Sequence, residues 1–182
     1  MVCHRIARVA ENLCNQCKVS YDHAWVVGSR QQALKELIDS YKFERVRLAY
    51  RSIVDLLDAV LPHLPPDTIV VPIPTIASHV RVRGYDHMAL IGRELAKRRN
   101  IRYTPLLKRA TTTVQRGANR SQRHTQAKHA FQVPTACEST RYLVIDDICT
   151  TGFTLEYAAR ALRVAGATEV WVATVATQPL EN

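Results

Sequence analysis

Residues 142–154 read YLVIDDICTTGFT and form the most informative stretch of this 182-residue chain. Four mainly apolar residues predict a buried strand, two adjacent acids follow it, and a short Thr/Gly loop leads into the apolar spacing of a helix. A strand, loop and helix in this order place polar residues at the carboxyl edge of a parallel sheet, where open α/β folds bind ligands. The stretch therefore predicts an α/β fold with a binding site directly after this strand.

The residue types in the stretch indicate the ligand. Backbone amides of the loop and of the first helical turn suit a phosphate monoester, as does the helix dipole. The carboxylates of Asp146 and Asp147 accept hydrogen bonds, so the paired hydroxyls of a ribose suit them. The alternative is structural, with the acids capping the helix and the threonines closing a turn. The predicted phosphate-binding residues are Thr150, Thr151, Gly152, Phe153 and Thr154.

The flanking sequence predicts further elements of the same fold. The helix after residue 154 is expected to end at Gly166, and residues 169–175 predict another apolar strand. Upstream, apolar spacing predicts two amphipathic helices between residues 29 and 60. The β-branched run 68–71 is expected to be the first strand of the main sheet. Strands that alternate with helices predict a parallel sheet flanked by helices.

A loop that carries Arg81, Arg83 and Gly84 is expected after this first strand. Asp86 is a suitable N-cap for the helix that follows the loop. His87 is interpreted as packing at the start of that helix or as a surface group, because no partner for it is evident. Cys149 is interpreted as a packing residue inside the phosphate loop.

The net charge of +9 is uneven, because residues 95–137 contain no acid. Such a stretch suits phosphates on a small substrate or on a nucleic acid, and the alternative is a solvated basic face. Residues 108–131 show no periodicity and predict a long loop, with short hairpin or helical pieces, that can close over the site as a lid. Its predicted functional residues are Lys108, Arg109, Arg116, Arg120 and Arg123.

Residues 1–24 predict a separate Cys/His-containing head, followed by one larger domain at 25–182. The pair Cys14 and Cys17 has the spacing of a zinc half-site. Cys3 is the third expected ligand, and the fourth would be His4, His23 or a residue upstream of Met1 that this sequence lacks. The alternatives are a degenerate zinc knuckle or buried free thiols.

The bulk composition excludes several classes of protein. No apolar run approaches the roughly 20 residues needed to cross a bilayer, so no membrane insertion is expected. No secretory signal is evident, and five cysteines without such a signal are expected to be mostly reduced. The cytoplasm is the expected location. The length suits one globular domain with a small appendage.

Residues 142–154 resemble the motif by which type I phosphoribosyltransferases bind phosphoribosyl pyrophosphate (PRPP). Over nearly the whole chain, the sequence resembles the ComF family of competence-associated phosphoribosyltransferase-like proteins. The supporting segments are 71–75 (VPIPT), 81–87 (RVRGYDH), Lys108-Arg109 and 41–43 (YKF). The resemblance implies a type I phosphoribosyltransferase fold with a small zinc-binding head.

The resemblance also implies roles for residues outside the main motif. Pyrophosphate would bind at Pro72, Ile73, Arg81 and Arg83, with Mg²⁺ bound together with PRPP. The head departs from the family because it keeps three of four expected cysteines, which weakens the zinc prediction. Thr150 stands where purine-salvage relatives have an acid, which argues against an ordinary purine acceptor.

Two classes of function remain open at this point. One is a phosphoribosyltransferase that transfers the 5-phosphoribosyl group of PRPP to an unknown acceptor and holds the ribose hydroxyls with Asp146 and Asp147. The other is a non-catalytic accessory protein that handles single-stranded DNA in natural competence, or a regulator that senses PRPP. PRPP is the expected partner in either case, single-stranded DNA is a second candidate, and a homodimer is a candidate assembly.

Overall fold

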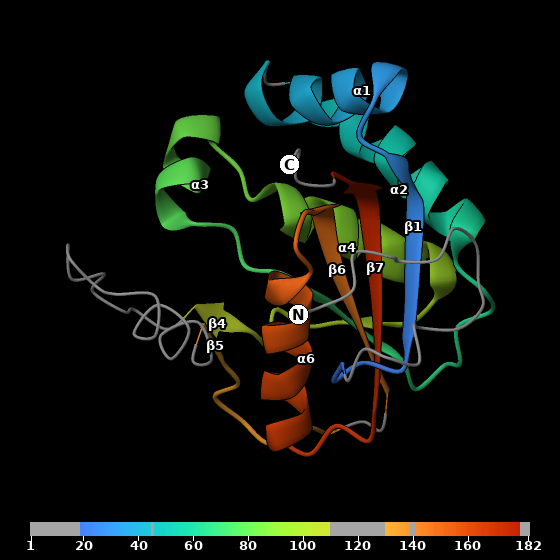
Figure 1. The fold of residues 1–182 in the computed structure, drawn as a ribbon, viewed down its shortest axis with the longest axis vertical. Coiled ribbons are helices and arrows are strands. Elements are labelled where there is room, and N and C mark those ends of the chain that lie inside the picture. Colours follow the sequence, from blue (N-terminus) through green and yellow to red (C-terminus); the bar gives the residue numbers. More distant parts are fainter. Residues whose placement is uncertain (1–18, 45, 110–129, 139–140, 179–182) are drawn as a thin grey trace.

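The computed structural model describes residues 19–44, 46–109, 130–138 and 141–178. Its centre is a five-stranded sheet in which all neighbouring strands run parallel (Figure 1). The parallel α/β architecture predicted from the sequence is therefore confirmed. In spatial order the strands are β1 (His23–Ser29), β7 (Glu169–Thr177), β6 (Arg141–Cys149), β2 (Ile69–Pro72) and β3 (Arg102–Tyr103).

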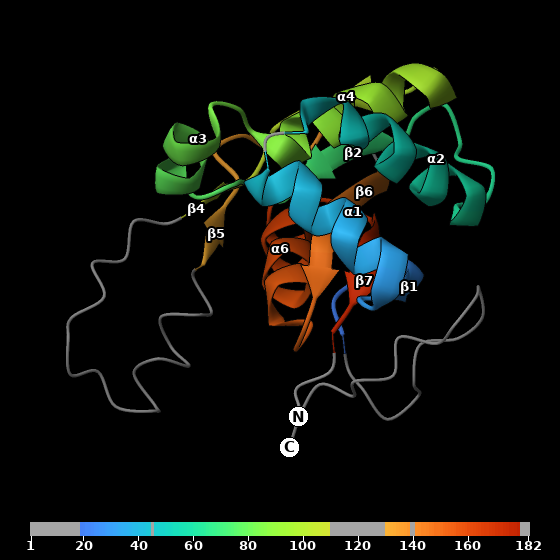
Figure 2. The same cartoon turned by 90° about the horizontal axis from the view of Figure 1, so that it is seen from above.

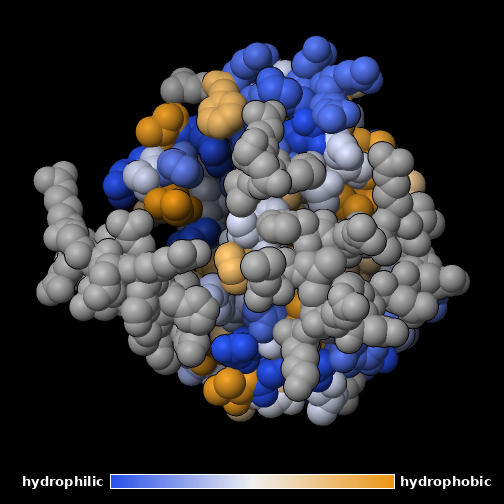
Figure 3. All heavy atoms as spheres, in the orientation of Figure 1, coloured by the Kyte–Doolittle hydropathy of each residue, from blue (hydrophilic) through white to orange (hydrophobic). Residues whose placement is uncertain are grey.

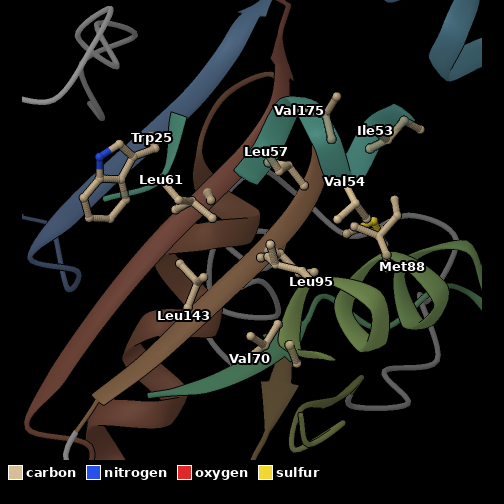
Figure 4. Packing of buried hydrophobic residues seen from close by; sticks show 14 of the residues in the cluster. Trp25, Ile53, Val54, Leu57, Leu61, Val70, Met88, Leu95, Leu143 and Val175 are labelled. Atoms are coloured by element: carbon tan, nitrogen blue, oxygen red, sulfur yellow. The ribbon is translucent and has the colours of Figure 1, made fainter. Parts of the chain in front are cut away.

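Helices cover both faces of the sheet. One face packs against α2 (Tyr50–Val60) and α4 (His87–Arg99), and the other packs against α6 (Phe153–Val164) (Figure 2). Strands buried on both faces need apolar residues at consecutive positions, which explains the unbroken apolar runs of β2 and β6. Figure 4 shows residues of one core cluster, with Leu143 on the sheet and Leu57, Met88 and Leu95 on the helices that cover it.

The first strand of the sheet differs from the prediction. Residues 68–71 were expected to begin the sheet, but β1 precedes them and pairs with β7 from His23 opposite Trp171 to Ser29 opposite Thr177. The apolar part of β1 is short and follows directly on the cysteine-rich segment, so its pattern was too brief to separate from the head. Its pairing with β7 joins segments at opposite ends of the chain, which local periodicity does not reveal.

The predicted helices between residues 29 and 60 are confirmed as α1 (Gln32–Phe43) and α2, with the short 3-10 helix η1 (Arg47–Ala49) between them. Asp86 caps α4, since its Oδ1 accepts hydrogen bonds from the backbone of Met88 and Ala89 at 3.1 Å each. The end of α6 also agrees with the prediction, because Gly166, with a φ of 107°, follows the C-cap residue Ala165.

Residues 77–83 differ from the prediction of a loop. They form α3 (Ala77–Arg83), which ends at Gly84 with a φ of 80°. The helix has no buried residue, so it lacked the apolar face that reveals a helix in a sequence. Both α1 and α3 lie beyond the carboxyl ends of the strands, at the top and upper left of Figure 1.

A second, two-stranded sheet lies beside the main one. Its strands β4 (Lys108–Arg109) and β5 (Phe131–Gln132) run antiparallel, with Arg109 opposite Phe131. The hairpin pieces predicted for residues 108–131 are therefore present at both ends of that segment. Its centre, which includes Arg116, Arg120 and Arg123, lies outside the described residues.

Most of the predicted head, including Cys3, Cys14 and Cys17, also lies outside the described residues. Residues 19–24 are described: 19–22 pack against the larger domain, and His23 and Ala24 are the first residues of β1. Tyr21 is buried, and the backbone nitrogen of Asp22 donates to the carbonyl oxygen of Val170 at 2.7 Å. No helix in the described parts of the chain combines the length and the apolar character needed to cross a bilayer.

Candidate active site

A cavity of about 530 Å³ lies where β2 and β6 end. Its walls come from the end of α1, the residues after β2, α3, the start of α4 and the end of β6. This volume falls within the range of roughly 300–1,000 Å³ that is typical of small-molecule sites. Figure 3 shows hydrophobic and hydrophilic residues side by side over α3, at the upper left.

The two carboxylates Asp146 and Asp147 are consecutive residues of β6, and both line the cavity. Side chains alternate along a strand, so Asp147 follows Leu143 and Ile145 on the face that α2 and α4 cover. Asp146 follows Tyr142 and Val144 on the other face. The end of β6 thus brings carboxylates from two faces of the sheet to one opening.

Asp147 lies between two basic side chains. Its Oδ2 is 2.5 Å from Nζ of Lys42 in α1 and 2.5 Å from Nε2 of His87 in α4. Burial opposes ionisation, but the hydrogen bond from His87 and the positive charge of Lys42 outweigh it and hold the pKa of Asp147 well below its usual range. Asp147 therefore carries a negative charge at neutral pH.

Asp146 has the opposite electrostatic environment. Burial and the negative charge of Asp147 raise the pKa of Asp146 to about 8. Its Oδ1 accepts a hydrogen bond of 2.9 Å from the backbone nitrogen of Asp147, which only partly offsets these effects. Near pH 7 the ligand-free pair therefore carries one negative charge and one proton.

His87 is buried at the start of α4, as one interpretation of the sequence had it, but the expectation that it lacks a partner is wrong. Its Nδ1 lies 3.0 Å from Nη1 of Arg83 and 3.1 Å from Oγ1 of Thr75. A guanidinium can only donate, so Nδ1 accepts from Arg83 and the ring hydrogen lies on Nε2, where it is donated to Asp147. The Thr75 hydroxyl donates to Oδ1 of Asp86 at 2.8 Å. His87 is thus buried at the start of α4 and orients the Asp147 carboxylate.

The predicted phosphate loop turns sharply at Gly152, which has a φ of 74° and begins α6. This left-handed conformation favours glycine. Thr154, in the first turn of α6, lines the cavity, whereas Thr150 is exposed at the end of β6. Phe153 lies against Tyr157 with ring centroids 6.0 Å apart. Cys149 is buried in the core, as interpreted from the sequence, and burial raises the pKa of its thiol to about 11.

Of the four residues predicted to bind pyrophosphate, two line the cavity and two do not. Ile73 lines the cavity, and its backbone nitrogen donates to the carbonyl oxygen of Ile145 at 2.9 Å. Pro72 is the buried last residue of β2. Arg83 also lines the cavity, whereas Arg81 is exposed on α3 and is not among the lining residues.

The two basic residues of β4 lie at the edge of this region. Arg109 lines the cavity, donates from Nε to the carbonyl oxygen of Pro74 at 2.8 Å, and has its guanidinium 5.3 Å from the ring centre of Phe131. Lys108 is exposed.

Of the candidate zinc ligands, only His23 is described, and its ring packs 5.2 Å from Trp171 and 5.6 Å from Trp25.

Sequence reasoning missed Lys42 and His87 as site residues. Both belong to segments that were quoted for the family resemblance, 41–43 and 81–87, so that resemblance was the one signal that could have found them. Neither residue lies in a catalytic motif that spacing reveals. Their meeting at Asp147 depends on how α1 and α4 pack over the end of β6.

The chain is similar in sequence to known proteins. The family model described as "Phosphoribosyl transferase domain" matches residues 102–181. Competence protein F from Haemophilus influenzae is 28% identical, and the similarity covers 87% of this chain and 76% of that protein.

Two solved structures resemble the chain at low sequence identity. A purine phosphoribosyltransferase from Pyrococcus horikoshii is 16% identical, with a TM-score of 0.43 over 71% of this chain and 73% of that one. An adenine phosphoribosyltransferase from Thermoanaerobacter pseudethanolicus is 14% identical, with a TM-score of 0.45 over 74% of this chain and 83% of that one. The domain match and the similarity to Competence protein F together make this chain similar to the ComF-like, phosphoribosyltransferase-related proteins.

Proposed function

We propose that this protein binds PRPP and transfers its 5-phosphoribosyl group to an acceptor, with release of pyrophosphate. The observation that carries the proposal is the meeting of two carboxylates, the start of α6 and two arginines at one cavity. A ribose diol needs strong hydrogen-bond acceptors, whereas phosphates need backbone amides and guanidinium groups. The cavity offers both kinds of partner.

The 5-phosphate would bind at the loop 150–152 and the first turn of α6. The first backbone amides of a helix have no partner within the helix, so they can donate to phosphate oxygens. The hydroxyl of Thr154 would add a further donor from the cavity wall. The ribose hydroxyls would then lie over Asp146 and Asp147, with Lys42 and His87 keeping Asp147 ionised.

The carboxylate oxygens also fit a Mg²⁺ ion that enters with PRPP. Mg²⁺ prefers oxygen ligands and keeps part of its coordination for phosphate oxygens and water. The contacts of Asp147 with Lys42 and His87 use Oδ2, and the backbone contact of Asp146 uses Oδ1. The other oxygen of each carboxylate is therefore available to support the ion, which would supply charge neutralisation for the pyrophosphate.

In the proposed reaction, the electron pair of the acceptor forms a bond to the anomeric carbon with inversion. The bond from that carbon to the pyrophosphate oxygen breaks, and pyrophosphate leaves with the electron pair. Arg83 and Arg109 line the same cavity as the carboxylates and would stabilise the negative charge that develops on the leaving group. The protein's contribution is to position the reactants and to neutralise charge.

Calorimetric titration with PRPP and Mg²⁺ tests the proposal. The double variant Asp146→Asn/Asp147→Asn should weaken binding by about tenfold or more, since hydrogen bonds to charged groups contribute about 1.5–3 kcal/mol each. The matched control Asp55→Asn/Asp58→Asn removes two carboxylates of α2 that pair with Arg98 and Arg99, outside the cavity lining. Equal affinity in the wild type and the site variant would refute the ribose assignment.

The second candidate is a non-catalytic protein that handles single-stranded DNA. The similarity to a competence protein and the net charge of +9 favour it. If neither the wild type nor the variant binds PRPP, single-strand affinity should be measured as a function of salt. Contacts with phosphates predict that affinity falls steeply as salt rises.

A further inference from the structure

Two tyrosines join α1 to α4 beside the site, although neither lines the cavity. The hydroxyl of Tyr41, in the last turn of α1, donates to the carbonyl oxygen of His87 at 2.7 Å. The hydroxyl of Tyr85, just before α4, donates in return to the carbonyl oxygen of Tyr41. The two hydrogen bonds run in opposite directions between the same two segments, and we call this arrangement the tyrosine clamp.

The rings of the tyrosine clamp also pack against one another. The ring centroids of Tyr41 and Tyr85 lie 5.6 Å apart, and the Tyr41 ring lies 6.1 Å from the imidazole of His87. The guanidinium of Arg47 lies over Tyr85, 6.0 Å from its ring centre. Tyr41 is 1% exposed, so its hydrogen bond forms in a low-dielectric environment, where it is stronger than in water.

The tyrosine clamp lies next to both side chains that engage Asp147. Lys42 directly follows Tyr41, and His87 is the residue whose carbonyl oxygen Tyr41 holds. The side chains of Lys42 and His87 each meet Oδ2 of Asp147 at 2.5 Å. A shift of α1 or of the first turn of α4 would therefore pass directly to that carboxylate.

Helix α1 is held by a small buried area. Of its twelve residues, Ile38 and Tyr41 are buried. Apolar burial attracts without a preferred direction, whereas a hydrogen bond requires a defined distance and angle. The Tyr41 hydroxyl therefore supplies a directional contact that sets how α1 lies over the end of β6.

We propose that Tyr41 and Tyr85 are positioning residues for the Asp147 carboxylate. By holding Lys42 and His87 at Oδ2, the tyrosine clamp keeps Oδ1 available for the ribose hydroxyls of PRPP. The inference rests on the proposed PRPP binding and deepens it, because it assigns a role to two residues outside the cavity lining. Functional groups need such support, since a misplacement of about 1 Å costs up to about 100-fold in rate.

Phenylalanine substitutions test the tyrosine clamp, because they remove a hydroxyl and keep the ring. In calorimetric titrations with PRPP and Mg²⁺, Tyr41→Phe and Tyr85→Phe should each weaken binding about threefold or more. The two effects should not add fully in the double variant, since both hydroxyls act through one arrangement. Tyr50→Phe is the matched control, because Tyr50 is half-buried against the same core and lies outside the cavity lining. Urea unfolding verifies that each variant is folded under the titration conditions.

A background that lacks the carboxylate separates positioning from a general structural role. Asp147→Ala removes the oxygens that the tyrosine clamp is proposed to position. Adding Tyr41→Phe or Tyr85→Phe to Asp147→Ala should therefore leave the remaining PRPP affinity unchanged within about twofold. A purely structural effect of the hydroxyls would persist in this background.

A second measurement needs no ligand. The hydrogen on Nε2 of His87 is donated to Asp147 over 2.5 Å, so it should give a strongly downfield proton signal in NMR spectra of the ligand-free protein. Tyr41→Phe and Tyr85→Phe should move this signal upfield and speed its exchange with water. Tyr50→Phe should leave it in place.

Three results would overturn the inference. They are unchanged PRPP affinity in both variants of the tyrosine clamp, a loss that persists with Asp147→Ala, and an equal loss in Tyr50→Phe. If PRPP still binds and depends on Asp146 and Asp147, only the role of the tyrosine clamp is wrong. If the wild type does not bind PRPP, the proposed function is wrong and the His87 signal decides the inference, which a signal unmoved by either variant refutes.

Discussion

Replacing Lys42 by methionine tests the electrostatic design of the site most directly. The side chains of Lys42 and Asp147 are 12% and 15% exposed, and Nζ lies 2.5 Å from Oδ2. Methionine keeps most of the length of the apolar stem, so the substitution removes mainly the charge. The ionised Asp147 would then be left in a largely buried position with His87 as its remaining partner among these contacts.

The expected loss is worked from this geometry. Removing one partner of a buried ion pair costs about 3–5 kcal/mol, and the hydrogen bond from His87 should lower the cost for Lys42→Met to about 2–3 kcal/mol. Asp147→Asn removes the charge that Lys42 compensates. The double variant Lys42→Met/Asp147→Asn should therefore be more stable than Lys42→Met alone, with a coupling of about 1–2 kcal/mol.

Urea unfolding measures these differences as shifts in the midpoint at constant slope. Lys35→Met is the matched control, because Lys35 lies on the same helix and pairs with Asp39 at 3.0 Å but is 55% exposed. An exposed pair of this kind contributes about 0–1 kcal/mol. Equal small losses in both variants, or a double variant that shows no coupling, would refute the argument that Lys42 neutralises a buried carboxylate.

Two further predictions concern Asp146 and Gly152. The folded protein holds a proton on Asp146 up to about pH 8, whereas an unfolded Asp releases it near pH 4, so the free energy of unfolding should fall as pH rises between these values. Unfolding measured from pH 5 to 9 should show a shallower fall in Asp146→Asn, and parallel curves would contradict the raised pKa. Gly152→Ala should lower stability by about 1–2 kcal/mol, because its φ of 74° is left-handed. Gly28→Ala is the control in β1, where an added Cβ meets Leu34 at 3.5 Å in ordinary contact, and a similar loss there would refute the backbone argument.

Much of the fold could be predicted from the sequence because its signals are local. The apolar run of β6, its two acids and the glycine turn into α6 lie within thirteen consecutive residues and imply a parallel sheet. The cap at Asp86 is likewise a short-range pattern. The helix α3 was missed because it buries no residue and therefore shows no apolar periodicity.

Other features depend on contacts between distant parts of the chain. The strand β1 joins the sheet only by pairing with β7, and its short apolar run resembles many others. His87 lies 60 positions before Asp147, and Lys42 belongs to a helix that crosses the end of the sheet. Local patterns show which residues form helices and strands, whereas the packing of those elements brings their side chains together. The carboxylate pair could therefore be read from the residues of one strand, while its partners Lys42 and His87 emerged from the packing of α1 and α4 over that strand's end.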